Sequence, residues 1–232
     1  METRILNVGE ITPSVISVTL EKPVNFEYKP GQFINITLTV ENCDERCNKR
    51  NFTLTSSPLD DNLMIATRRG ISRFKKTLTK SAPDTIVNIS PPLGRFTLNE
   101  ENSVPLIMFA GGIGITPFHS MIRYAAKKNL LESITLLYSN TKANDVPFKE
   151  EFDAIVATHP RIKVHHTITG DESWEGRRGR IDEDMIRDIV KNLNECEYYV
   201  CGPQVLVTAL VDVLKKMNIR EEKIKFEQFT GY

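Results

Sequence analysis

The chain has 232 residues, a formal net charge of zero and 40% hydrophobic residues. This length suits one large domain or two ordinary ones, and the composition is typical of a globular protein rather than a disordered chain or a nucleic-acid binder. No apolar run reaches the roughly 18 residues that a membrane-spanning helix needs. The first residues do not resemble a signal peptide, and four cysteines without such a signal favour the cytoplasm.

The first hundred residues predict short β-strands rather than helices. β-rich segments are separated by turn signals such as Lys29-Pro30-Gly31 and Asp60-Asp61-Asn62. Many short strands with proline and glycine between them are typical of an antiparallel β-barrel or sandwich. The predicted strands are 4–10, 15–20, 32–40, 51–55, 63–67 and 85–89, with one short helix at 72–78.

Within this region, Arg50 and Phe52 lie two residues apart on a predicted strand. Side chains alternate along a strand, so these two face the same side and can contact one ligand. Arginine suits a phosphate group and an aromatic ring suits a planar heterocycle. The alternative is an edge strand with a solvated arginine and a phenylalanine in the core.

The segment 68–80 is strongly basic and contains no acidic residue; its cations are Arg68, Arg69, Arg73, Lys75, Lys76 and Lys80. Gly70 and Ser72 stand where the short helix would begin, and Ser72 can cap it. A helix start of this kind can hold phosphate. A solvated basic face explains the same residues equally well.

After 91–94 the pattern changes to strands that alternate with amphipathic helices, which indicates βα units and a parallel sheet. The predicted strands are 104–110, 134–138, 162–166, 198–201 and 224–226, and the predicted helices are 116–128, 147–158, 182–192 and 203–217. We therefore expect two domains: an antiparallel β-barrel at 1–100 and an α/β domain with a parallel sheet at 101–232.

The apolar strand at 104–110 is followed by Gly111, Gly112 and Gly114, and then by Thr116-Pro117 at the start of a helix. Thr116 can cap that helix, and proline suits its first turn. Glycines let the backbone approach a ligand closely, and the free N–H groups of a helix start favour an anion. The sequence thus predicts a phosphate cradle, although a structural turn can also use such glycines. The acidic residue that usually grips a ribose about 20 residues later is missing.

The strand at 198–201 ends in Cys201-Gly202-Pro203. In an open α/β sheet, ligands bind at the carboxyl ends of the strands. Cys201 is therefore expected at the same sheet edge as Gly111–Gly114. The alternative for Cys201 is a small buried hydrophobic residue.

In this order, these segments resemble the motifs of the ferredoxin–NADP reductase superfamily. Arg50-Asn51-Phe52-Thr53 resembles the flavin motif, the glycine segment resembles the nicotinamide-nucleotide motif, and Cys201-Gly202-Pro203 resembles the cysteine-glycine-proline motif. Pro92-Leu93-Gly94-Arg95-Phe96 is similar to the segment that closes the flavin domain, and 226–232 is similar to the end of compact, stand-alone members. One departure is Phe52, which stands where tyrosine is commonest.

The resemblance implies a Greek-key barrel that binds FAD and a second domain that binds NADH or NADPH. It implies FAD contacts from Arg50, Asn51, Phe52, Thr53, Thr67, Arg69, Gly70, Ile71, Ser72 and Tyr232. For the nicotinamide nucleotide it implies contacts from Gly111, Gly112, Gly114, Thr116, Pro117, Cys201, Gly202 and Pro203. The expected catalytic residues are Thr53 near the reactive flavin nitrogen, Cys201 in the nicotinamide pocket, Glu227 as a proton relay and Tyr232 as a lid over the flavin.

The implied activity is hydride transfer from NAD(P)H to FAD, followed by electron delivery to a separate acceptor. The basic segment favours a small acidic electron carrier such as a ferredoxin as that partner. The alternatives are a reductase of free flavin or quinone, and a non-catalytic nucleotide-sensing or electron-transfer subunit of a larger complex. The preference between NADH and NADPH and the oligomeric state stay open.

The sequence predicts no metal site and no iron–sulfur domain. It has no cysteine set of the plant-type iron–sulfur kind. Cys43 and Cys47 offer two thiols, which cannot complete a zinc site, and we expect a surface pair there, with a redox-active pair as the alternative. The four histidines, at 119, 159, 165 and 166, show no catalytic or metal-binding spacing.

Overall fold

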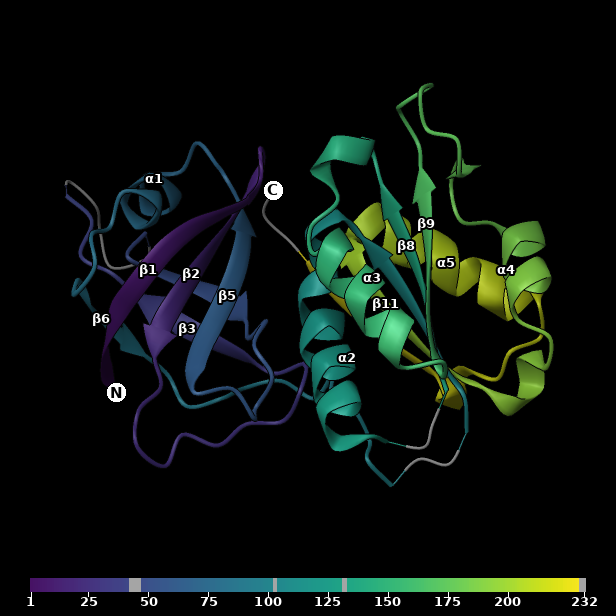
Figure 1. Ribbon diagram of the computed structural model, residues 1–232, viewed down its shortest axis with the longest axis horizontal. Helices are drawn as coiled ribbons and strands as arrows, with labels where there is room; N and C mark the ends of the chain where they lie inside the picture. Colours follow the sequence, from purple (N-terminus) through teal and green to yellow (C-terminus); the bar gives the residue numbers. More distant parts are fainter. Residues whose placement is uncertain (42–46, 102–103, 131–132, 230–232) are drawn as a thin grey trace. The chain divides into compact units, whose positions relative to one another are not determined.

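The computed structural model of the chain describes residues 1–41, 47–101, 104–130 and 133–229. Its contacts group the chain into two units, shown in Figure 1. The first unit comprises Met1–Leu98 and Thr116–Lys127, and the second comprises Asn99–Ile115 and the chain from Lys128 onward. Cys43 and Tyr232 lie outside the described residues, so their assigned roles stay predictions.

The first unit is built on a six-stranded sheet in the order β4-β3-β6-β1-β2-β5, in which every pairing is antiparallel. An isolated bridge between Leu54 and Ile65 joins the chain just after β4 to β5, so the two end strands of the sheet meet. The antiparallel barrel predicted from the sequence is confirmed. Its strands are β1 (Glu2–Thr12), β2 (Val15–Glu21), β3 (Phe33–Thr37), β4 (Lys49–Thr53), β5 (Asn62–Arg68) and β6 (Ile86–Ile89).

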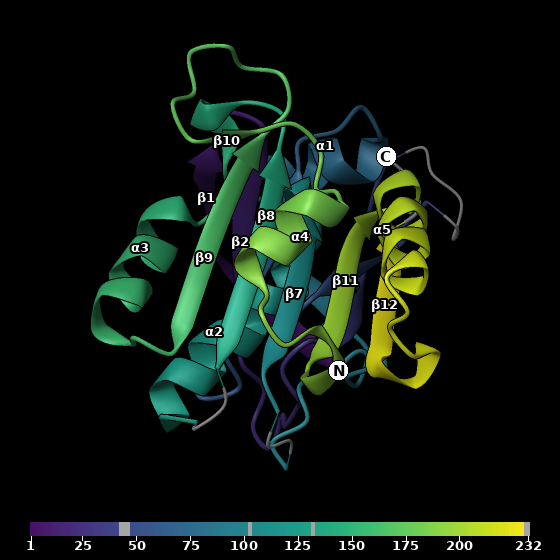
Figure 2. The same cartoon turned by 90° about the vertical axis from the view of Figure 1, so that its right-hand side faces the viewer.

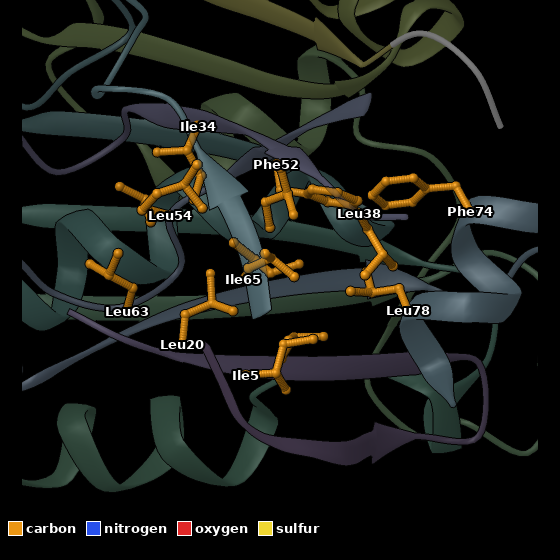
Figure 3. Packing of buried hydrophobic residues seen from close by; sticks show 14 of the residues in the cluster. Ile5, Leu20, Ile34, Leu38, Phe52, Leu54, Leu63, Ile65, Phe74 and Leu78 are labelled. Carbon is orange, nitrogen blue, oxygen red and sulfur yellow. The ribbon is translucent and has the colours of Figure 1, made fainter. Parts of the chain in front are cut away.

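The barrel core follows from the alternation of apolar and polar residues along its strands. In β2, Ile16, Val18 and Leu20 are buried, while the side chains between them are partly exposed. Helix α1 (Arg73–Thr79) adds Phe74 and Leu78 to this core, as Figure 3 shows. Ser72 caps α1 as expected, because its side chain accepts a hydrogen bond from the backbone N–H of Lys75 at 3.3 Å.

Helix α2 (Thr116–Lys128) packs on the barrel of the first unit, although it follows β7 of the second unit in the chain. The ring of Phe118 meets that of Phe96 edge-on, with the ring centroids 5.7 Å apart. Such contacts group Thr116–Lys127 with the first unit, although α2 follows the first strand of the second unit in the chain. The predicted boundary between residues 100 and 101 stays a prediction.

The second unit is a six-stranded parallel sheet in the order β10-β9-β8-β7-β11-β12. This confirms the predicted α/β fold. Its strands are β7 (Leu106–Gly111), β8 (Ile134–Asn140), β9 (Ile162–Ile168), β10 (Arg177–Arg178), β11 (Glu197–Pro203) and β12 (Ile224–Phe229). Its α-helices are α3 (Lys149–Thr158), α4 (Glu183–Ile189) and α5 (Gln204–Lys216), and its short 3-10 turns are η1 (Gly112–Ile115), η2 (Ala143–Asp145), η3 (Leu193–Glu195) and η4 (Glu221–Lys223).

Helices α4 and α5 pack on one face of this sheet, where they share a core with β7, β8 and β11 (Figure 2). All six residues of β7 are buried, as expected for the central strand of a sheet that is covered by helices. Within the described residues, no helix is long and apolar enough to cross a membrane.

The strand order of the second unit reverses at β7. The chain passes from β7 to β8 and β9 on one side, whereas β11 and β12 are added on the other side. In open parallel sheets, ligands bind at the carboxyl ends of the strands where the order reverses. The fold therefore places the candidate nucleotide site at the ends of β7 and β11.

Candidate functional site

Glycines bring the ends of β7 and β11 into close contact. A Cβ on Gly114 would lie 2.5 Å from both the Cys201 carbonyl oxygen and the Gly202 Cα, a distance that real side chains do not reach. Gly112, at the start of η1, has a φ of 51°, which glycine adopts without steric cost. Because of the close contacts at Gly114, the chain can take this path only with glycine at that position.

Cys201 and Gly202 form the β11 side of this arrangement. Cys201 pairs with Ala110 in the β7–β11 register, and a Cβ on Gly202 would lie 3.3 Å from the backbone nitrogen and oxygen of Gly111. The structure thus brings the predicted glycine segment and Cys201-Gly202-Pro203 together, with main chain where side chains would otherwise stand. Closely approaching main chain with N–H groups is a typical phosphate cradle.

The start of α2 differs from the sequence prediction in one respect. The helix has the predicted bounds, 116–128, but Thr116, which was expected to cap it, is its first helical residue because η1 runs directly into α2. The 3-10 turn supplies the backbone bonds that a cap would otherwise replace. Pro117 is consequently the second residue of the helix, and both side chains are buried. From β8, the Tyr138 hydroxyl donates a hydrogen bond to the Gly112 carbonyl at 3.0 Å.

Cys201 and Glu227 lie opposite each other on the paired strands β11 and β12. Burial raises the pKa of the Cys201 thiol well above its ordinary value, with a further contribution from Glu227. Burial also raises the pKa of Glu227 to about 7. The carboxylate oxygen Oε2 of Glu227 has no hydrogen-bond partner among the described residues. Glu227 can therefore hold or release a proton near neutral pH.

In the first unit, Arg50 and Phe52 contact the same aromatic ring. The Phe52 ring is stacked on Phe74 with the ring centroids 5.9 Å apart, and the Arg50 guanidinium carbon lies 5.9 Å from the Phe74 ring centroid. Thr53 and Phe52 are both buried, while Asn51 is exposed. Arg50 and Phe52 thus approach the same ring, and Phe52 lies in the barrel core on an end strand of the sheet, as the alternative interpretation expects.

The basic segment after β5 is less uniform in the structure than in the sequence. Arg69, one of the residues predicted to contact FAD, forms an ion pair with Glu10 of β1 at 2.6 Å. Thr67 is buried on β5, whereas Ile71 is 92% exposed. Gly70 approaches the side chain of Lys75, whose Cδ would lie 2.6 Å from a Cβ at that position.

A group of cations lies near this segment. Burial lowers the pKa of Lys75, and the positive charges of Arg68 and Arg50 lower it further. Arg50 and Arg68 are thus each close enough to Lys75 to repel its charge, and we call these three residues the cation cluster. Such a cluster fits the charge of a diphosphate. Neither Lys75 nor Arg68 was among the FAD-binding residues predicted from the sequence, although both belong to the basic run noted there.

Sequence reasoning missed a set of polar residues that attach α2 to the barrel. His119 and Ser120 are fully buried and bond to the carbonyls of Thr55 and Ser56. Farther along the helix, Arg123 forms an ion pair with Asp60 at 3.0 Å. The sequence signal is the presence of polar residues beside the apolar face of a helix. It does not identify their partners, which are backbone carbonyls about 64 residues away for His119 and Ser120 and the Asp60 carboxylate for Arg123.

His166 lies on β9 beside Tyr138, with the ring centroids 5.8 Å apart. Within the residues that the structure describes, no three His, Cys, Asp or Glu side chains are arranged to hold a metal ion.

Two family models match the chain. An FAD-binding domain matches residues 1–117, and an oxidoreductase NAD-binding domain matches residues 108–212. The two matches follow each other in the order of the barrel and the parallel sheet.

Curated relatives match over most of this chain. The ferredoxin–NAD(P)(+) reductase component of the naphthalene 1,2-dioxygenase system of Pseudomonas putida is 27% identical over 216 residues, which cover 92% of this chain and 63% of the relative. An NADPH oxidoreductase of Mycobacterium tuberculosis is 33% identical over 213 residues, which cover 87% of this chain and 53% of the relative. The chain therefore spans between about half and two thirds of the length of these relatives.

Solved structures share the fold. The FAD/NAD-binding domain of nitric oxide dioxygenase from Vibrio cholerae superposes with a TM-score of 0.86 at 20% identity, covering 98% of both chains. A ferredoxin NADP+ reductase from Neisseria gonorrhoeae superposes with a TM-score of 0.84 at 16% identity, also covering 98% of both chains. These structures show the shared fold, and the two family models show the family. The chain belongs to the ferredoxin–NADP reductase superfamily, with an FAD-binding domain followed by an oxidoreductase NAD-binding domain.

Proposed function

We propose that the protein takes reducing equivalents from NADH or NADPH, passes them through FAD and delivers them to a separate acidic electron carrier of the ferredoxin type. The observation that carries this proposal is the close approach of Gly114 to Cys201 and Gly202 at the strand reversal. This main-chain cradle suits the diphosphate of a nicotinamide nucleotide, and the barrel that precedes it in the chain belongs to an FAD-binding family.

The charge of several barrel residues supports FAD as the ligand of the first unit. The cation cluster of Arg50, Arg68 and Lys75 would hold the FAD diphosphate, with Gly70 and Ser72 beside it. Phe52 would lie against the flavin ring, and Thr53 at the end of the same strand would hydrogen-bond to it. FAD, when bound, supplies the redox chemistry by accepting a hydride and releasing electrons singly.

In the second unit, Gly111, Gly112, Gly114 and Gly202 would bind the nucleotide diphosphate through the main chain. Cys201, with its neutral thiol, would line the nicotinamide position. Glu227, paired with Cys201 in the sheet register, would exchange a proton with solvent as the flavin changes its charge.

The proposed acceptor is supported by charge and by the names of relatives. The naphthalene dioxygenase relative is a ferredoxin reductase component, and a glycine betaine monooxygenase reductase subunit of Chromohalobacter salexigens is 28% identical over 204 residues. The basic segment after β5 would attract an acidic carrier and speed its association at low ionic strength.

A sequence of spectroscopic measurements tests the proposal. The purified chain, loaded with FAD, is mixed anaerobically with NADH or NADPH, and the loss of the oxidised flavin band is followed. Rapid bleaching, followed by reoxidation with an oxidised ferredoxin, is the expected result. Transfer only to free flavin or a quinone would replace the proposed acceptor, and a chain that binds no FAD would contradict the enzyme function.

A further inference from the structure

The segment that follows β4 is polar yet completely enclosed. Thr55, Ser56 and Ser57 are each at most 2% exposed. A buried peptide carbonyl needs a hydrogen-bond donor, because leaving it unpaired costs the free energy of its desolvation. The backbone N–H groups of Thr55 and Ser56 bond to the carbonyl of Met64 on β5, at 2.7 and 3.3 Å.

Helix α2 supplies donors for the carbonyls of this segment. His119 Nδ1 lies 2.8 Å from the Thr55 carbonyl oxygen, and since a carbonyl can only accept, Nδ1 carries the proton in this bond. The Ser120 hydroxyl donates to the Ser56 carbonyl at 2.6 Å. The Tyr28 hydroxyl donates to the same Ser56 carbonyl at 2.9 Å. Two neighbouring residues of α2 thus hold two consecutive peptide groups.

These contacts continue to Thr53. The Thr55 hydroxyl donates to the Thr53 carbonyl at 3.4 Å and accepts from the Ala66 N–H at 3.1 Å. The position of Thr53 is therefore fixed on one side by β3, its partner in the sheet, and on the other side through the segment that His119 and Ser120 hold.

We propose that His119 and Ser120 are positioning residues for Thr53, which set the placement of its hydrogen-bonding groups toward the flavin. The proposal rests on the proposed function, in which Thr53 contacts FAD. Buried and fully paired polar networks are rigid, and a displacement of about 1 Å at a reacting centre can slow a reaction about a hundredfold. The two residues touch no ligand in this account and act only through the peptide groups after β4.

The test compares variants that remove a hydrogen-bond donor from α2 with variants that keep or restore the bonds to the carbonyls of Thr55 and Ser56. Ser120→Ala removes one bond while Tyr28 still donates to the Ser56 carbonyl, so this variant is expected to fold. His119→Leu removes the bond to Thr55, and His119→Asn restores an N–H near the Nδ1 position. Arg123→Gln is the matched control, because it breaks the ion pair of the same helix with Asp60 and leaves both carbonyl bonds in place.

Three measurements test whether the loss of a donor disturbs the segment after β4 and the flavin. Amide hydrogen exchange at 54–57 in the apo protein is expected to rise at least about tenfold in Ser120→Ala and His119→Leu. In the FAD-loaded protein, the flavin absorption band and midpoint potential are expected to shift. Flavin reduction in a single turnover is expected to slow about tenfold, with one FAD still bound per chain. His119→Asn recovers most of each effect, and Arg123→Gln lowers the melting temperature but changes none of the three.

Unchanged exchange in Ser120→Ala and His119→Leu would overturn the proposal, as would equal effects from Arg123→Gln. Faster exchange with an unchanged flavin band and reduction rate would also overturn it, because the carbonyl bonds would then be structural only. A wild-type chain that fails to bind FAD would instead contradict the proposed function and, with it, the positioning role. If Ser120→Ala fails to fold, Ser120→Cys, which keeps the side-chain volume and weakens the donor, takes its place.

Discussion

Cys201 and Glu227 are paired residues of neighbouring parallel strands, and burial favours the neutral form of each side chain. The pKa of the thiol is raised well above its ordinary value, and the pKa of the carboxyl group is raised to about 7. Below about pH 7, where Glu227 is mostly protonated, the pair adds little negative charge beside the glycine cradle and repels the expected phosphates only weakly.

The raised pKa of Glu227 predicts a pH dependence of both stability and activity. The folded protein keeps this proton at pH values at which the unfolded chain, with an ordinary pKa of 4.5, has lost it. The free energy of unfolding should therefore fall through this group as the pH rises from 4.5 to about 7. Glu227→Gln should remove that fall, as measured by urea unfolding at pH 5 and pH 8.

In the same variant, the rate of flavin reduction should lose its inflection near pH 7. Glu222→Gln, at an exposed position just before β12, serves as the control and should keep the wild-type profile. An inflection that persists in Glu227→Gln would assign it to another group.

Gly114→Ala should damage nucleotide binding in the second unit. The added Cβ would stand 2.5 Å from the Cys201 carbonyl oxygen, so the end of β7 or of β11 must shift. Overpacking of this kind costs about 1–3 kcal/mol of stability. We expect the KM for NADH or NADPH to rise at least about tenfold while FAD remains bound, measured by steady-state kinetics and flavin absorbance.

Gly170→Ala is the matched control for Gly114→Ala. At Gly170 the nearest atom to an added Cβ is the methyl group of Thr141 at 3.0 Å, and this side chain is able to move. A KM that changes equally in both variants would show that the cradle geometry is not responsible.

Arg50→Gln should weaken FAD binding through the loss of one member of the cation cluster. A hydrogen bond to a charged group contributes about 1.5–3 kcal/mol, so the dissociation constant for FAD should rise about 10- to 100-fold. Equilibrium dialysis at low and high salt measures this, and the wild-type affinity should fall with salt more steeply than that of the variant. Lys80→Gln, at the end of α1, should leave the dissociation constant within about twofold of the wild type. Equal loss in both variants would indicate a general charge effect.

His166→Leu should stabilise the protein in acid. Burial is the main cause that lowers the pKa of His166 to about 4, with Lys149 contributing, and neither ring nitrogen has a hydrogen-bond partner among the described residues. The unfolded chain takes up a proton near its ordinary pKa of 6.5, so the free energy of unfolding should fall as the pH drops from 6.5 toward 4.

Leucine at this position cannot bind a proton, and it removes two buried polar atoms that cost about 1–3 kcal/mol when unpaired. The melting temperature of His166→Leu should therefore exceed that of the wild type by more at pH 5 than at pH 7.5. His159→Leu, at the end of α3, is the control, and an equal gain from it would contradict the explanation.

The sequence predicted the features that are local or periodic. The apolar strand β7, the strand predicted at 15–20 and the helix cap at Ser72 each depend on residues close together in the chain, and all three were found. The helix predicted at 116–128 has the bounds of α2, but the capping role expected of Thr116 was not found, because the sequence gives no sign that a 3-10 turn leads directly into this helix.

The features that the sequence could not predict join distant segments. The ion pair of Arg69 with Glu10 depends on β2, which pairs with both β1 and β5 and so brings the end of β5 near Glu10. The bonds of His119 and Ser120 go to backbone carbonyls. Because every residue has a carbonyl, the residue types in the sequence do not identify which carbonyls are the partners. Burial, which decides the protonation of Glu227, is likewise a property of the assembled sheet.

The grouping of α2 with the barrel limits how the chain can be divided for expression. A fragment cut at residue 100 would release the helix from the carbonyls of Thr55 and Ser56 and would uncover Phe118, whose ring packs on Phe96. The barrel fragment would then expose to water two peptide groups that are enclosed in the whole chain. It would also expose an apolar surface, which favours aggregation. Useful truncations must therefore keep Thr116–Lys127 with the first ninety-eight residues, for instance through a circularly permuted gene.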